Sequence, residues 1–302
     1  MRRIWLLKGM LMSLGMLLFI WLSSQHAILT DAVVPSASPL PAQSIRYEQR
    51  TLADSVAHIL SIPSRSRFLV TPALSQSLKT VEEFSQQHQA IATLNGGFFD
   101  PKNQKTTSVV VLQGKLVADP RKNERLVNNP NLKPYLTKIL NRTELRRYLC
   151  GQAVSYDIAL HSELPPTGCQ LITALGGGPQ LLPELTLVSE GFVDNTNGRD
   201  ALGSTQPNAR TAVGITSDGN IVLVMIAQKP GVPRNSGMSL PVLADFMKSL
   251  GIEKAMNLDG GSSSSLNYNG KTFYGKVDSE GNPVKRPVKS VLIVEESLEN
   301  LK

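Results

Sequence analysis

The chain has 302 residues, of which 41% are hydrophobic, enough for one large domain with a sizeable core. Its formal net charge of +7 is modest, aromatic residues make up only 5%, and no basic stripe is interleaved with aromatic side chains. This composition argues against a nucleic-acid-binding protein. The 4 histidines show no ligand spacing, so the composition also gives no support for a zinc site.

Residues 1–32 have the pattern of a targeting segment. Arg2, Arg3 and Lys8 precede an apolar stretch over 9–22. This stretch is shorter than the roughly 20 residues that a membrane span needs, and it matches the core of a secretory signal. No clear small-x-small cleavage site follows, so a signal anchor that attaches the protein to the membrane is the alternative to a cleaved signal peptide. In both cases we expect an exported protein that is periplasmic, extracellular or membrane-anchored.

A linker and then the main domain are expected after this segment. Residues 33–44 are rich in Pro and Ser and predict the linker, and residues 45–302 contain the domain. The run 56–62 fits either a strand or a helix. The apolar side chains between Leu74 and Phe84 fall on one helical face and predict a helix over 74–88.

The first glycine turn follows the next apolar run. Residues 90–94 predict a strand, which leads into Asn95-Gly96-Gly97-Phe98-Phe99-Asp100. Glycines at such a turn let main-chain N–H groups converge without interference from side chains. Residues 108–112 and 115–118 then flank Gln113-Gly114 and predict a tight hairpin.

The segment from about 119 to 170 is an insert rich in Arg and Lys, which we call the basic insert. A helix is predicted over 135–149. The positive charge fits either a lid over an anionic polymer or a solvated helix face. Cys150 and Cys169 are the chain's 2 cysteines. In an exported protein such a pair favours a disulfide over two separate thiols, and a loop of this length contributes about 3 kcal/mol in the chain-entropy model.

Two further glycine-rich segments lie in the second half of the chain. Gly176-Gly177-Gly178 follows the apolar run 171–175, and Arg210 stands at the start of a predicted strand. Residues 211–216 and 221–227 predict a hairpin. Its second strand is apolar throughout and is expected at the centre of a sheet, buried on both faces.

The last glycine turn carries a carboxylate. Ser239 is the expected N-cap of a helix that ends before Gly251, and a strand over 255–258 leads into Asp259-Gly260-Gly261-Ser262-Ser263. Asn269-Gly270 marks another hairpin, and 288–294 predicts a closing strand. Hairpins with few helices predict an α+β fold: a mixed, mainly antiparallel sheet with flanking helices, in a single domain of the catalytic type.

These strand-end segments, in this order, resemble the phosphodiester glycosidase family. The matching pieces are 95–99, 177–180, 209–214 and 257–263, with Arg286-Pro287-Val288 before the last strand. The resemblance covers roughly residues 45–295. The chain departs from the family pattern at Ser262, where a third glycine is common, and in the long basic insert. The resemblance implies a hydrolase that cleaves the glycosidic bond of a sugar-1-phosphodiester or a related glycan, with a carbohydrate or sugar phosphate as its partner.

The strand ends offer suitable groups for such a reaction. Asp259 is the candidate nucleophile or general base, and Asp100 is the candidate acid. Arg210 is expected to grip phosphate oxygens with its planar fork. The other expected substrate-binding residues are Asn95, Gly96, Gly97, Phe98, Gly260, Gly261, Ser262 and Ser263. The N–H groups of Gly260, Gly261 and Ser262 are expected to form an anion nest.

Two alternatives stay open at this stage. The same pocket and the basic insert would also suit a non-catalytic cell-envelope module that binds anionic glycans. No cofactor is expected, although Ca²⁺ or Mg²⁺ on Asp259 is an alternative use of that carboxylate. A Ser-His-Asp triad is disfavoured because no Gly-x-Ser-x-Gly elbow occurs.

Overall fold

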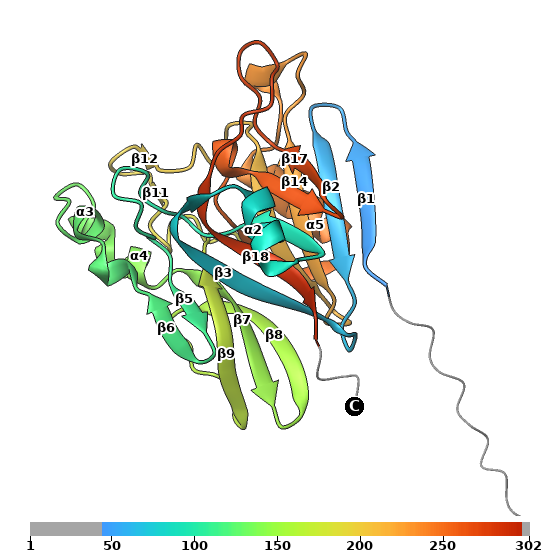
Figure 1. Ribbon diagram of the computed structural model, residues 1–302. Helices are drawn as coiled ribbons and strands as arrows, with labels where there is room; N and C mark the ends of the chain where they lie inside the picture. Colours follow the sequence, from blue (N-terminus) through green and yellow to red (C-terminus); the bar gives the residue numbers. More distant parts are fainter. Residues whose placement is uncertain (1–43, 298–302) are drawn as a thin grey trace, which may run out of the picture. The chain divides into compact units, whose positions relative to one another are not determined.

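The computed structural model describes residues 44–297 (Figure 1). The predicted signal peptide or anchor over 1–32 and nearly all of the linker over 33–44 lie outside these described residues. Within the described part, no helix is long and apolar enough to cross a membrane.

Residues 44–297 form three large antiparallel sheets and a short ribbon. The first sheet has the order β1 (Arg46–Thr51), β2 (Val56–Ile62), β14 (Ile221–Ala227), β13 (Arg210–Thr216), β15 (Ile252–Asn257) and β10 (Gln180–Leu182). The second has the order β17 (Lys271–Tyr274), β16 (Ser265–Tyr268), β4 (Ala92–Asn95), β18 (Val288–Glu296) and β3 (Phe68–Lys79). The third has the order β6 (Lys115–Ala118), β5 (Val110–Leu112), β9 (Cys169–Gly176), β7 (Thr143–Cys150) and β8 (Ala153–Leu160). The ribbon pairs β11 (Val193–Asp194) with β12 (Arg199–Asp200).

The fold is a sheet-rich version of the expected α+β class. The hairpins predicted around 113–114, 217–220 and 269–270 are confirmed as β5–β6, β13–β14 and β16–β17. The sheets are not mixed, however, because every strand pair between residues 44 and 297 is antiparallel. Antiparallel strands need only short turns, whereas parallel strands need long crossovers.

Strand β14 shows how the core is layered. Leu223 and Met225 point to a central core that receives side chains from all three sheets. Val224 and Ile226 point to the opposite face, where they pack with helix α5 (Leu240–Ser249). All seven residues of β14 are buried, which confirms the predicted central strand. Each such aliphatic side chain contributes roughly 1.5–3 kcal/mol by leaving water, so this strand holds two layers together.

The helix predicted over 74–88 is wrong in its first half. Strand β3 continues to Lys79 because its second half pairs with β18, as in the register Leu74↔Ser290. Helix α2 (Val81–His88) begins only after Thr80, whose hydroxyl accepts a hydrogen bond from the Glu83 N–H while the Glu83 carboxylate accepts from the Thr80 N–H. This capping box is a start signal that apolar periodicity alone does not show.

The helix predicted over 135–149 is also wrong beyond its first turns. Helix α4 (Leu136–Leu140) is short, and the chain then enters β7, which pairs with β8 and β9. Strand pairing and the burial of Leu145 and Tyr148 override the local helical pattern. The predicted disulfide is confirmed: Cys150 and Cys169 occupy paired positions of β7 and β9, with their Cα atoms 4.2 Å apart.

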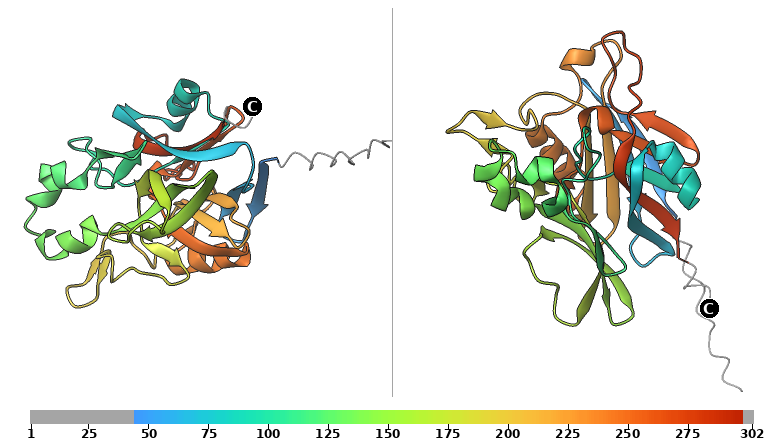
Figure 2. Two further views of the ribbon diagram at one scale, coloured as in Figure 1. Left: turned by 90° about the horizontal axis from the view of Figure 1, so that it is seen from below. Right: turned by 60° about the vertical axis from the view of Figure 1, so that its left-hand side comes forward.

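The basic insert packs beside the β11–β12 ribbon. Helices α3 (Glu124–Val127) and α4 lie next to this ribbon in each view of Figures 1 and 2. The Tyr135 hydroxyl, just before α4, donates to the Asp194 carboxylate at 2.8 Å. The insert is therefore part of the fold, and its strand β7 lies between β9 and β8 in the third sheet.

Candidate functional site

The ends of β4, β9 and β15 and the start of β13 meet at one corner of the sheets. The Asp259 N–H, after β15, donates to the Gly96 carbonyl, after β4, at 3.0 Å. The Gly261 N–H donates to the Ala209 carbonyl, before β13, at 2.8 Å. The Gly178 N–H, after β9, donates to the Asn257 carbonyl at 2.9 Å. The structure thus brings together the four segments that the sequence analysis placed in one site.

Glycine is required at two of these positions because main chains approach closely. A Cβ atom on Gly97 would lie 2.4 Å from the Gly176 carbonyl oxygen. A Cβ atom on Gly177 would lie 2.8 Å from the Asn257 carbonyl oxygen. Either contact is too short for any side chain, so these glycines allow the three sheets to join at the corner.

Asn95 clamps the corner from within. Its side chain is fully buried, and its Oδ1 accepts hydrogen bonds from the Thr211 hydroxyl at 2.9 Å and the Ser265 N–H at 3.1 Å. Its Nδ2 donates to the Asp259 carbonyl at 2.6 Å. Asn95 was expected among the substrate-binding residues, and its side chain instead makes hydrogen bonds that connect β4, β13 and the turn after β15.

Arg210 has a similar internal role in place of the predicted phosphate contact. Its side chain is 3% exposed, and its guanidinium donates four hydrogen bonds of 2.8–3.1 Å to main-chain carbonyls. The acceptors are Met238, Leu202, Gly203 and Gln206. Since a guanidinium has five N–H donors, this arginine is almost saturated by the protein and closes the loop before β13.

Asp100 lies in an ion pair that does not suit the predicted general acid. Its Oδ2 is 2.6 Å from Nε of Arg125, at helix α3, and its Oδ1 accepts from the Lys102 N–H at 2.8 Å. Burial alone would raise the pKa of Asp100, but these hydrogen bonds and the Arg125 charge hold it below its usual value. The carboxyl is therefore ionised at neutral pH and has no proton to give.

Asp259 has the opposite electrostatic environment. Burial of its carboxyl raises the pKa of Asp259 to about 6, against the opposing effects of the Ser263 hydroxyl, the Arg286 charge and the Gly260 N–H. Of the carboxyl groups with a shifted pKa in residues 44–297, this is the one shifted upward. A pKa near neutrality is typical of a group that exchanges protons in catalysis.

The turn after Asp259 is a 3₁₀ turn, η4 (Gly261–Ser263), rather than an open anion nest. The Gly260 N–H donates to the Asp259 carboxylate at 3.0 Å, and the Gly261 N–H is bonded to the Ala209 carbonyl. Two of the three N–H groups predicted to hold an anion are thus used within the protein. The turn instead positions the carboxylate of Asp259 and the hydroxyl of Ser263 beside each other.

Arg286 is a charged site residue that the sequence analysis did not assign. Its Nη1 donates to the Ser262 hydroxyl at 2.7 Å, and its guanidinium carbon is 5.3 Å from the centroid of the Phe99 ring. It is partly exposed, and its charge acts on the Asp259 carboxyl. The sequence did contain an indication of this residue. Arg286-Pro287-Val288 is a family-like segment at the start of the closing strand, and its arginine was an alternative to Arg210 as the expected phosphate contact.

Glu190 is a second residue that no sequence motif indicated. It is 1% exposed and accepts hydrogen bonds from the N–H groups of Thr143 and Gln180, both at 2.8 Å, and from the Thr143 hydroxyl at 2.7 Å. These bonds fix the chain just after Gly178 and at the start of β7. Glu190 thereby ties the start of β7, in the basic insert, to the corner.

The basic insert does not present one uniform cationic face. Arg146 is 3% exposed and pairs with the equally buried Glu144 at 2.9 Å, whereas the Arg121 side chain is 65% exposed and pairs with Asp119. Its charges are therefore divided between the interior, surface ion pairs and Arg142, which lies beside Phe98. Neither a wholly solvated face nor a continuous lid describes this arrangement.

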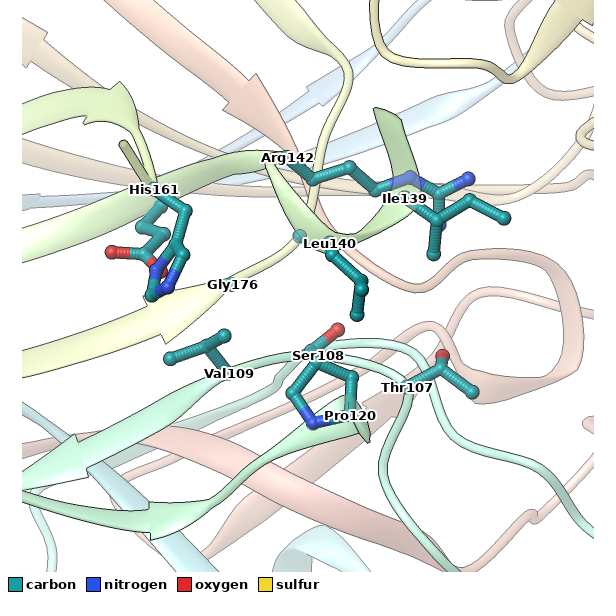
Figure 3. A pocket seen from close by; sticks show the side chains of 11 residues that line it. Thr107, Ser108, Val109, Pro120, Ile139, Leu140, Arg142, His161 and Gly176 are labelled. Carbon is teal, nitrogen blue, oxygen red and sulfur yellow. The ribbon is translucent and has the colours of Figure 1, made fainter. Parts of the chain in front are cut away.

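A small cavity adjoins the corner and is shown in Figure 3. Its volume is about 10 Å³, and Ser108, Leu140, Arg142 and Gly176 are among the residues that surround it. Such a volume holds one water molecule and no sugar. A larger cavity of about 510 Å³ lies between β3, β6 and the start of β18, and Lys105, Lys122 and Lys289 contribute to its wall. Asp259 and Arg286 line neither cavity.

A metal site receives no support from the arrangement of side chains. Between residues 44 and 297, no group of three or more His, Cys, Asp or Glu side chains is placed to hold a metal ion. The corner itself presents one carboxyl group with a raised pKa, hydroxyl groups and a guanidinium.

Comparisons with known proteins identify the family and the fold. The family model for phosphodiester glycosidases matches residues 88–295. No curated protein sequence matches the chain. Among solved structures, it is similar to the catalytic domain of zebrafish N-acetylglucosamine-1-phosphodiester alpha-N-acetylglucosaminidase, auto-inhibited by its pro-peptide, with a TM-score of 0.64 and 18% identity over 86% of this chain and 85% of that one. It is also similar to a hypothetical protein from Synechocystis, with a TM-score of 0.54 and 16% identity over 84% of this chain and 64% of that one. At such identities the likeness shows the fold alone.

Proposed function

The chain belongs to the phosphodiester glycosidase family, and from this premise we propose that it is an exported hydrolase that cleaves the glycosidic bond of a sugar-1-phosphodiester or a related envelope or extracellular glycan. Family membership supports a glycosidase-type function. The disulfide between Cys150 and Cys169 supports export, because such bonds persist in oxidising compartments.

The observation that carries the catalytic part of the proposal is the position of Asp259 where the strand-end segments meet, next to the Ser263 hydroxyl and the Arg286 charge, and this position raises its pKa. At about 6, this pKa leaves the carboxyl mostly ionised at neutral pH but still basic enough to accept a proton. The ionised group either takes a proton from the water that attacks the anomeric carbon, or attacks that carbon itself to form a glycosyl ester that water then hydrolyses. In both routes the bond between the anomeric carbon and the phosphate oxygen breaks, and its electron pair stays on the phosphate.

Arg286 is the cation proposed to receive that developing charge. Its guanidinium acts electrostatically on Asp259, and one hydrogen bond to Ser262 leaves most of its donors free. A guanidinium fork suits phosphate oxygens, and fixed cations at a developing charge typically accelerate reactions by about 10²–10³-fold. A phosphate leaves as an anion, so the reaction does not need the separate carboxylic acid that was expected at Asp100.

Phe98 and the substrate-facing part of the turn complete the proposed site. Phe98 is partly exposed next to the corner, and its ring centroid is 5.8 Å from that of Phe192. An exposed aromatic face is a suitable surface for the apolar side of a sugar ring. Ser262, bonded to Arg286, offers a hydroxyl for the sugar or the phosphate.

A non-catalytic module that binds anionic glycans would use the same cations but has no use for Asp259. A carboxylate next to the bound anion repels it, which weakens binding. The desolvated carboxyl group thus favours catalysis over simple binding.

The test is turnover of model sugar-1-phosphodiesters by the protein and by its Asp259→Asn variant. We expect release of the phosphate monoester by the wild type and a loss of at least about 10³-fold in kcat for the variant, as is usual when the reacting carboxyl group is removed. Equal turnover by the variant would remove Asp259 from catalysis. Salt-sensitive glycan binding by the wild type without any product would identify the binding module instead.

A further inference from the structure

Arg142 stands at the edge of the corner and belongs to the basic insert. It lies between α4 and β7, and the carbonyl of the next residue, Thr143, accepts a hydrogen bond from the Gly177 N–H at 2.9 Å. Its guanidinium carbon is 3.6 Å from the centroid of the Phe192 ring and 6.0 Å from that of Phe98. Figure 3 shows this side chain extending away from His161. An arginine of the insert therefore stacks next to the aromatic wall of the proposed site.

The charged end of Arg142 has almost no protein partner. Its Nε donates to the Glu190 carbonyl at 3.3 Å, whereas its Nη1 and Nη2 donate to no atom of residues 44–297. Both nitrogens are in contact with solvent, because neither is among the fully buried side-chain atoms of the described residues that lack a hydrogen-bond partner. Burial of the rest of the group lowers the pKa of Arg142 to about 9, so it stays protonated at neutral pH.

Placing the Arg142 guanidinium here costs free energy unless a bound group accepts its remaining hydrogen bonds. A partly desolvated cation gives up hydrogen bonds to water and regains only one weak bond from the protein. Stacking on Phe192 returns part of this free energy and holds the planar group in one orientation. Arg210, which is bonded to four carbonyls, shows what a structural arginine looks like in the same molecule.

Two neighbouring charged side chains act on Arg142. The negative charge of Glu190 acts on Arg142 and favours its charged form, but the Glu190 carboxylate oxygens accept hydrogen bonds from Thr143, Gln180 and Thr186 and none from Arg142. A second arginine, Arg199, adds positive charge that acts on Arg142. Arg199 belongs to the β11–β12 ribbon, and its guanidinium carbon lies 4.7 Å from the centroid of the Tyr135 ring. Since Glu190 and Arg199 act on Arg142 in opposite directions, the feature that suits an anion beside Phe98 is the pair of Arg142 Nη groups without a partner in residues 44–297.

We propose that Arg142 binds an anionic group of the substrate other than the phosphate that leaves, so that the preferred substrate carries at least two negative charges. This inference rests on the proposed function, in which Arg286 serves the leaving phosphate beside Asp259. The substrate class is then an anionic glycan, in which a second phosphate or a uronate carboxylate lies near the bond that breaks. A guanidinium with two free Nη groups binds either oxyanion in a bidentate manner.

The experiment compares three sugar-1-phosphodiesters that differ only in the second group: none, a phosphate or a carboxylate. For the wild type we expect kcat/KM to be at least tenfold higher for a doubly charged substrate, mainly through a lower KM. In Arg142→Met, which keeps an apolar chain over Phe192, this preference is expected to disappear. Arg142→Lys is expected to retain part of it, because a point charge remains without the fork. The phosphate and carboxylate arms identify which oxyanion the residue serves.

Arg121→Met is the matched control, because Arg121 is an exposed, ion-paired arginine of the same insert. The control should keep the wild-type preference. An undiminished preference in Arg142→Met, or an equal loss in Arg121→Met, would overturn the proposal.

A separate binding measurement covers the case in which the wild type cleaves none of these substrates, which would contradict the proposed function. Calorimetry with inorganic pyrophosphate then tests Arg142 alone. At least tenfold weaker binding by Arg142→Met than by Arg121→Met supports the anion site, and equal binding by the two variants refutes it.

Discussion

The start of β13 and the turn after β15 contact each other, yet they treat their charged side chains in opposite ways. At β13, Arg210 gives four hydrogen bonds to carbonyl groups and is closed off from solvent. At the turn, the desolvated Asp259 carboxyl accepts hydrogen bonds from the Gly260 N–H and the Ser263 hydroxyl, and the neighbouring Arg286 keeps guanidinium nitrogens without a partner in residues 44–297. Arg142, in the basic insert, does the same. A saturated charge stabilises the fold, whereas an unsaturated charge costs stability and is available to a substrate.

The largest effect should come from removing the saturated charge. Arg210→Met leaves several buried carbonyls without donors, and we expect a loss of about 3–5 kcal/mol in the free energy of unfolding. Urea denaturation measures this loss, with Arg121→Met as a surface control that should change little. The comparison fails if Arg210→Met is as stable as the wild type and instead binds substrate more weakly.

Removal of Arg286 should show the reverse pattern. Arg286→Met is expected to lower kcat/KM by about 10²-fold, equivalent to roughly 2.7 kcal/mol of transition-state stabilisation, because the developing charge on the leaving phosphate loses its cation. Steady-state kinetics and urea denaturation of the same preparation separate the two effects. An Arg286→Met protein that is unstable but fully active per folded molecule would place this residue with Arg210.

Asp259 should lower the free energy of unfolding at pH values at which its carboxyl group is ionised. Its folded-state pKa of about 6 lies above the value of about 4 in an unfolded chain, so the folded protein binds the extra proton between these pH values. The stabilising contribution of the neutral carboxyl is present below about pH 4 and is lost as the pH rises through about 6. Asp259→Asn should therefore be more stable than the wild type by about 1–3 kcal/mol above pH 7.

That difference should vanish near pH 4, where the wild-type carboxyl is protonated. Thermal or urea denaturation across pH 4–8 gives the curve. A variant that is less stable than the wild type at pH 8 would mean that the carboxylate is satisfied like Arg210.

The smallest expected effect is the pH dependence of turnover. If ionised Asp259 is the base or nucleophile, kcat/KM should fall about tenfold per pH unit below pH 6 and level off above it. Initial rates in buffers of constant ionic strength measure this profile. A rate that falls as the pH rises through 6 would assign Asp259 as a proton donor.

Local sequence was a reliable guide to the turns and to the strands beside them. Asn269-Gly270 and Ser217-Asp218-Gly219-Asn220 predicted hairpins that the structure contains, because two or four residues determine whether a chain can reverse tightly. The wholly apolar β14 predicted its own central position, since only a strand covered on both faces tolerates that composition. The boundaries of α2 and α4 were missed because strand pairing with distant segments decided them.

The roles of charged side chains were decided by the tertiary structure. Arg210, Asn95 and Asp100 were sensible candidates by residue type, yet each is occupied by protein groups that are remote in sequence or lie on another element. Arg142, Arg286 and Glu190 acquired their positions in the same way. By itself the sequence determined the family, the glycine turns, the hairpins and the disulfide pair, because these depend on local backbone conformation and on residue type. Only the folded chain decided which charges are satisfied and which are free, because hydrogen bonding and desolvation depend on neighbours that the sequence leaves far apart.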